Sequence, residues 1–304
     1  MFRIRTCALT SPDLVFAYSD FILSRQTMNS RQATLDFYYY TCGKFLEWAE
    51  QHHSILKPTD ITSAYVREYI ASLIDKGRKD TTVWNNARAL KTMFSFWCAS
   101  DYMQVAIKFE TPKLFKKKLP RLTAEQLETI LRACNVRDRA IVSFKADTGV
   151  RRAEAISLNW IDVDMQTGLV MVRQGKGGKD RTTVVGAKVR RYLLAYQRTL
   201  PVDWRSGVLF KTDEGTRFTG NGMLAIYRRL RKKTGIYCSP HAMRRTWTIL
   251  GLRAGMNVLH QQHMGGWEDR TMQDHYAQIE DLDLLHEHRD HSPMDNLEKL
   301  KWEK

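Results

Sequence analysis

A basic segment with a proline near each end divides this chain of 304 residues into two parts. Residues 111–120 read Thr-Pro-Lys-Leu-Phe-Lys-Lys-Lys-Leu-Pro and show no periodicity of a helix or strand. Prolines and a run of like charges interrupt regular structure, and such segments are typical of domain boundaries. The sequence therefore predicts a first domain over 1–110, a linker over 111–120 and a second domain over 121–304.

The first part of the chain predicts a bundle of four helices, because apolar residues recur there at helical spacing. The expected helices run over about 12–26, from Arg31 past Trp48, from about 59 to 77, and from about 81 to 100. Thr59 or Asp60 is expected to cap the third helix, and Gly77 to end it. The many aromatic residues of these helices are interpreted as core packing and not as base-stacking groups.

The second part combines helices with one short hairpin. Thr123-Ala-Glu-Gln126 has the form of a capping box and predicts a helix start. Apolar runs at 168–173 and 181–185 flank a glycine-rich turn, which is typical of a β-hairpin. Further helices are expected over about 137–147, 151–158, 187–198, 219–233, 240–253, 257–264, 270–278 and 281–289. The predicted fold class is mainly α with a small β-sheet in the second domain.

Charge indicates the kind of partner. Lysine and arginine exceed aspartate and glutamate by 15, and this excess must lie on the surface, where it favours a polyanion such as nucleic acid. No apolar run reaches membrane-spanning length, so we expect no membrane partner. The five cysteines form no C-x-x-C pair, which argues against a zinc or dithiol site and fits the cytoplasm. We expect no metal and no other cofactor.

An ordered set of polar residues runs through the second part. Its members are Arg151 after Thr148-Gly149-Val150, Lys176 in the glycine-rich turn, His241 and Arg244 in H-A-M-R, Trp267 after two glycines, and Tyr276 nine positions later. A tyrosine hydroxyl can attack a DNA phosphate and conserve the bond energy as a phosphotyrosine, while two guanidiniums bind the non-bridging oxygens. A lysine can protonate the departing 5′-oxygen, and a histidine can bind an oxygen or accept the tyrosine proton.

This arrangement resembles the tyrosine recombinases, the phage integrase family, over most of the chain and in the expected order. The resemblance implies the following catalytic residues: Arg151, Lys176 in preference to Lys179, His241, Arg244, Trp267 where most members have a second histidine, and Tyr276 as nucleophile. It also matches Glu154 to an acidic residue whose role is more structural than chemical. The implied activity is that of a site-specific recombinase or integrase, acting through a covalent 3′-phosphotyrosine intermediate.

The resemblance further implies how the parts are used. Residues 1–110 would form a helical, SAM-like core-binding domain, and 121–304 a catalytic domain with a C-terminal tail, which together clamp duplex DNA. The expected partners are a double-stranded recombination site and three further copies, as a homotetramer on synapsed DNA in the cytoplasmic nucleoid. The linker residues expected to contact the DNA backbone are Lys113, Lys116, Lys117 and Lys118.

Two other functions fit the same residues. A type IB topoisomerase would use this chemistry to relax DNA, and a catalytically silent protein would only bind it. Each residue also has a structural interpretation: Arg151 and Arg244 as ion-pair partners of Glu154 or Asp147, for example, and Trp267 as core. The segment 281–289 could dock on a neighbouring protomer or pack on its own domain.

Overall fold

The computed structural model describes residues 9–114, 120–173 and 180–267, and the single residues 288, 292 and 294. The chain forms two compact units, Met1–Lys116 and Lys117–Lys304, which divide inside the segment 111–120. The fold is mainly helical with a small two-stranded sheet, as the sequence predicted. No helix in the described ranges is long and apolar enough to cross a membrane.

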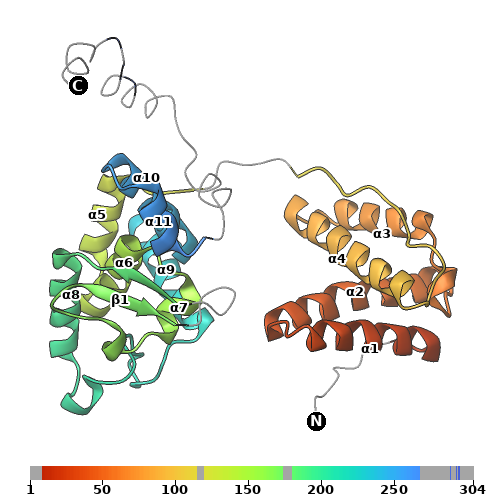
Figure 1. Cartoon of the computed structure of the whole chain (residues 1–304), viewed down its shortest axis with the longest axis horizontal. Coiled ribbons are helices and arrows are strands. Elements are labelled where there is room, and N and C mark those ends of the chain that lie inside the picture. The colour runs from red at the N-terminus through yellow and green to blue at the C-terminus, as the bar shows by residue number, and fades with distance from the viewer. Residues whose placement is uncertain are drawn as a thin grey trace, which may run out of the picture. The chain divides into compact units, whose positions relative to one another are not determined.

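The first unit is built from helices that pack around α2. Its helices are α1 (Pro12–Thr27), α2 (Gln32–His53), α3 (Ser63–Asp75) and α4 (Asp80–Ala99) (Figure 1). The fully buried rings of Phe45, Phe94 and Trp97 lie in its core. The Trp97 indole N–H donates to the Ala17 carbonyl at 2.8 Å. For these three aromatic residues the interpretation as core packing is confirmed.

The predicted start of the third helix was wrong. Pro58–Asp60 forms a short 3-10 turn, η1, in which the Asp60 carboxylate accepts from two backbone N–H groups ahead of it. Helix α3 begins only after Thr62, whose hydroxyl accepts from a backbone N–H three residues on. Asp60 and Thr62 can both cap, and local sequence does not reveal which of them opens the longer helix.

The second unit is organised around α6 (Val136–Thr148), which is buried on most of its surface. Helix α6 packs against α8 (Ala187–Thr199), α10 (Pro240–Arg253) and β2 (Arg181–Val184). The remaining elements are α5 (Ala124–Ala133), α7 (Arg152–Ser157), η2 (Trp160–Asp162), η3 (Val202–Trp204), α9 (Gly220–Thr234) and α11 (Val258–Gly265).

Local predictions for the second unit are confirmed. Strands β1 (Leu169–Val172) and β2 (Arg181–Val184) pair antiparallel, with the first residue of β1 opposite the last of β2. The capping box at Thr123 and Gln126 is formed in both directions, at 3.1 and 3.2 Å. The predicted helices 270–278 and 281–289 and the turn residues 174–179 lie outside the described residues.

Gly149 ends α6 and turns the chain toward Arg151. Its φ of +63° is left-handed, and a Cβ added there would lie 2.2 Å from the Trp247 ring. Glycine is therefore needed both for the backbone conformation and for the close approach of α10.

We expect Gly149→Ala to destabilise the protein more than Gly235→Ala. Gly235 ends α9 with a similar φ of +71°, but a Cβ there meets nothing within 4 Å. Gly235→Ala should cost about 1–2 kcal/mol for the left-handed backbone alone. Gly149→Ala should cost about 1–3 kcal/mol more for the added clash with Trp247. Urea unfolding measures both, and equal losses would contradict the packing argument.

Candidate active site

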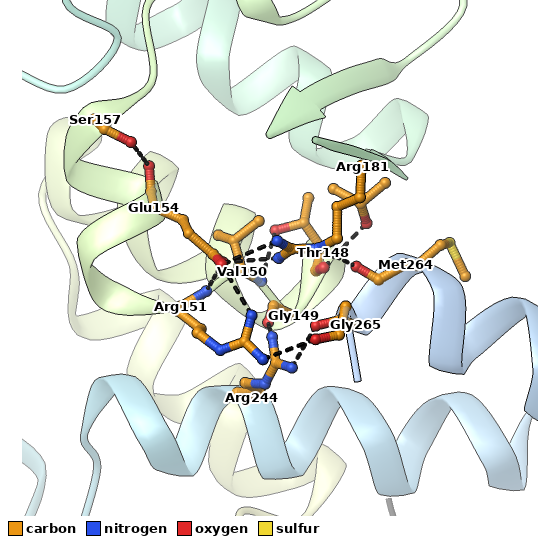
Figure 2. A network of polar contacts seen from close by, with 12 residues as sticks. Thr148, Gly149, Val150, Arg151, Glu154, Ser157, Arg181, Arg244, Met264 and Gly265 are labelled. Carbon is orange, nitrogen blue, oxygen red and sulfur yellow. Dashed lines mark hydrogen bonds and ion pairs between the residues drawn. The ribbon is translucent and has the colours of Figure 1, made fainter. Parts of the chain in front are cut away.

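Two arginines from distant parts of the sequence meet at the end of α11. Arg151 is the N-cap residue of α7, and its guanidinium donates to the Gly266 carbonyl at 2.9 Å. Arg244 comes from α10 and donates to the Gly265 carbonyl at 2.5 Å. Figure 2 shows the two side chains pointing toward the same short stretch of backbone. The structure thus places two guanidiniums side by side.

The two arginines differ in accessibility. Arg244 is only 2% exposed, and its guanidinium also donates to the Gly149 carbonyl and lies 4.8 Å from the centre of the Trp267 ring. The Arg151 side chain is 25% exposed. A buried cation is stable only where hydrogen bonds replace its hydration. Arg244 is therefore rigidly held, while Arg151 presents the more open guanidinium.

The Glu154 carboxylate also holds Arg151 in place, through two hydrogen bonds. It accepts from the Arg151 backbone N–H at 2.6 Å and from its guanidinium at 3.0 Å. Arg181, the first residue of β2, adds a bidentate pair at 2.9 and 2.7 Å (Figure 2). Burial alone would raise the pKa of Glu154, but Arg181 and then Arg151 hold that pKa at about 2. The predicted ion pair of Arg151 with Glu154 is confirmed, whereas Asp147 accepts from the Gly186 backbone.

Three successive carbonyls ahead of Arg151 each accept from a side chain of a different element. The Thr183 hydroxyl donates to Thr148 at 3.1 Å, Arg244 donates to Gly149, and the Lys145 ammonium donates to Val150 at 2.7 Å. These bonds come from β2, α10 and α6. They fix the short connection that delivers Arg151 to the site.

Lys145 was not expected from the sequence. It is fully buried, and burial together with the nearby charge of Arg244 lowers its pKa to about 7. Positions 141, 144, 145 and 148 lie on a single helix face, and the structure shows that all four are buried. A lysine on such a face must reach a polar partner inside the protein.

His241 lies in the first turn of α10, two positions after the N-cap residue Ser239. It is exposed at the protein surface. Desolvation, followed by the positive charges of Lys145 and Arg245, lowers the pKa of His241. Its imidazole is therefore mainly neutral at neutral pH and can accept a proton. Arg245 faces elsewhere, as expected, and donates to the Pro120 carbonyl.

Trp267 is 6% exposed, and its ring packs against Arg244 and against Trp247 at 5.8 Å. Lys113 is exposed in the first unit. The other predicted site residues lie outside the described ranges: Lys116, Lys117, Lys118, Lys176 and Tyr276. Within those ranges no cluster of His, Cys, Asp and Glu side chains is placed to hold a metal ion.

Comparisons with known proteins agree in one family. A model described as the phage integrase family matches residues 120–282. The tyrosine recombinase XerC 2 of Ralstonia nicotianae is 30% identical over 268 residues, covering 80% of this chain and 76% of that protein. The tyrosine recombinase XerA of Saccharolobus solfataricus is 24% identical over 281 residues, covering 89% and 91%.

Solved structures share the fold. The Tn1549 transposon integrase in complex with circular intermediate DNA matches with a TM-score of 0.72 at 20% identity, covering 91% of this chain and 99% of that chain. The crystal structure of XerA recombinase matches with a TM-score of 0.54 at 26% identity, covering 92% and 99%.

Lys145→Met should change how stability depends on pH. The ordinary lysine pKa is 10.5, and the folded value is about 7, so between these pH values the unfolded chain binds one proton more. The parent should therefore gain stability relative to Lys145→Met as pH rises, by up to about 1.4 kcal/mol per pH unit. Below pH 7 the difference between the two proteins should be constant.

Urea unfolding between pH 6 and pH 10 tests this on the parent and the variant, with Lys188→Met as control. Lys188 is exposed on α8, so its removal should not alter the pH dependence. A constant difference between the parent and Lys145→Met across the whole range would show that Lys145 stays charged in the folded protein.

Proposed function

This chain belongs to the phage integrase family, and on that premise we propose that it is a site-specific DNA recombinase or integrase. It would cleave and rejoin DNA strands through a covalent 3′-phosphotyrosine intermediate. The relatives reported above are named as recombinases and an integrase, which favours this function over DNA relaxation by a topoisomerase.

The observation that carries the proposal is the convergence of Arg151 and Arg244 on the adjacent carbonyls of Gly265 and Gly266. Attack on a phosphodiester builds negative charge on the non-bridging oxygens. Two guanidiniums held close together can bind both oxygens and remain charged at any working pH. Because their positions are set by the fold, little reorganisation is needed when the phosphate binds.

We assign the remaining roles as follows. The Tyr276 hydroxyl attacks the phosphorus, and Lys176 protonates the departing 5′-oxygen. The neutral His241 imidazole accepts the tyrosine proton or binds a phosphate oxygen. Trp267 supports Arg244 through its ring.

The proposed partner is a double-stranded recombination site in the nucleoid, which fits the net charge of +15. We propose that residues 1–110 form the core-binding domain and 121–304 the catalytic domain. The linker lysines Lys113, Lys116, Lys117 and Lys118 would lie along the DNA backbone. Recombination would take place in a homotetramer on two synapsed sites.

A covalent-adduct assay tests the function. Duplexes that bind the parent protein are selected from a random pool, and each is then nicked beside the cleaved phosphate so that the adduct is trapped. The parent should form a protein–DNA adduct, Tyr276→Phe should bind equally and form none, and Tyr237→Phe should behave as the parent. Tyr237 is a matched control, because it is an exposed tyrosine of the same unit. An adduct from Tyr276→Phe would disprove the nucleophile, and parent binding without any adduct would favour the silent DNA-binding protein.

A sulfur substitution tests which lysine is the acid. Lys176→Ala should slow cleavage strongly, and a 5′-bridging phosphorothioate should restore the rate, since a thiolate leaves without a proton. Lys179→Ala is the control and should cleave both substrates like the parent. If the phosphorothioate rescued Lys179→Ala and not Lys176→Ala, Lys179 would be the lysine that protonates the 5′-oxygen.

A further inference from the structure

Arg181 makes contacts that the reaction as assigned above does not use. Its guanidinium binds both oxygens of Glu154, and its Nε–H donates to the Met264 carbonyl at 2.9 Å. The side chain thereby joins the start of β2 to α7 and to the last turn of α11. Figure 2 shows Arg181 reaching Glu154 from the side opposite to Arg151.

These contacts form a closed ring of interactions that includes Arg151. Arg181 holds Glu154, Glu154 holds Arg151, and Arg151 donates to Gly266. The ring is completed by packing, because a Cβ on Gly266 would lie 2.7 Å from the Arg181 Cδ. Arg181 therefore touches both the anchor of Arg151 and the backbone to which Arg151 donates.

The contacts of Arg181 argue against a direct role toward DNA. Each of its three guanidinium nitrogens already donates to a protein oxygen, and two of these bonds go to the Glu154 carboxylate. A guanidinium held in a bidentate pair with a buried carboxylate is a poor ligand for a second anion. Any effect of Arg181 on cleavage must therefore pass through the groups that it touches.

We propose that Arg181 is a positioning residue that holds the Arg151 guanidinium against the end of α11. The inference rests on the proposed function, because it presumes that Arg151 binds the scissile phosphate. Without Arg181, the buried Glu154 carboxylate would keep only one cationic partner. Arg151 would then turn toward Glu154 to supply a second hydrogen bond and would release the Gly266 carbonyl. The phosphate-binding group would move away from Arg244.

Lysine should not replace Arg181. An ammonium is a point charge without the planar fork that binds two carboxylate oxygens and a carbonyl together. Arg181→Lys therefore keeps the positive charge beside Glu154 and removes the geometry. The Arg181→Lys variant therefore distinguishes a positioning role of Arg181 from a purely electrostatic role.

The test compares Arg181→Lys and Arg181→Met with Arg151→Lys, and uses Arg190→Lys as the matched control. Arg190 lies in α8 of the same unit, where its guanidinium donates to the carbonyls of Met165 and Gln166. Three quantities are measured for each full-length protein: thermal unfolding, DNA affinity, and the single-turnover rate of adduct formation on the nicked substrate. The rate is measured again with a methylphosphonate at the cleaved position, which replaces one charged oxygen by a methyl group.

Both Arg181 variants should bind DNA like the parent and cleave the normal phosphate more slowly, by on the order of 10²-fold, as Arg151→Lys does. On the neutral methylphosphonate the loss should largely disappear, because that substrate has less need of a guanidinium. The double variant Arg151→Lys/Arg181→Lys should be no slower than Arg151→Lys alone, since the two act as one unit. Arg190→Lys should match the parent in every assay.

Several results would overturn the proposal. Parent-like cleavage by the Arg181 variants would show that the position of Arg151 does not depend on Arg181. An equal loss on both substrates, or additive losses in the double variant, would mean that Arg181 acts apart from Arg151. Loss of cooperative unfolding in both Arg181 variants would make the residue a stability element only. If the parent protein binds DNA but forms no adduct, that result contradicts the proposed function. It does not test the positioning role of Arg181.

Discussion

The site depends on one buried carboxylate. Glu154 is 7% exposed and ionised, so hydrogen-bond donors must replace the water that it loses on burial. Those donors come from Arg151 and from Arg181, and they bring together α7, β2 and, through Met264 and Gly266, the end of α11. The interactions that satisfy this buried ion pair are thus the same ones that position Arg151, the arginine proposed to bind phosphate.

Secondary structure was predictable wherever it depends on neighbours in the sequence. The capping box at Thr123 and the hairpin strands follow from residue types a few positions apart, and both appear as expected. The start of α3 was predicted wrongly because Asp60 and Thr62 offer equivalent caps two positions apart. Which of them begins the longer helix depends on how the first unit packs, and local sequence does not contain that information.

In the candidate site, too, some residues can be predicted from the sequence and others depend on tertiary packing. Order, spacing and chemistry in the sequence predict that Arg151 and Arg244 belong to one site, and the structure brings the two side chains together. Arg181 and Lys145 could not be predicted, because each looks like an ordinary charged residue beside a strand or on a helix until its burial is known. Their partners are a carboxylate and a carbonyl brought close by tertiary packing. The residues proposed to contact the substrate form a motif in the sequence, whereas the residues that support them are recognised only in the folded structure.

The charge balance around Arg151 explains why this arrangement suits a phosphate. Arg151 and Arg181 bind a single carboxylate, and Arg244 and Lys145 donate to backbone carbonyls of the same site. Burial, together with the repulsion between neighbouring positive charges, lowers the pKa values of Lys145 and His241. A folded protein tolerates such an excess of positive charge only where hydrogen bonds to backbone carbonyls compensate it in part. On the proposed function, an incoming phosphodiester would relieve the remaining repulsion, and the transition state, with more negative charge on its oxygens, would relieve it further. The unfavourable energy of holding these cations together would then favour the transition state over the free site.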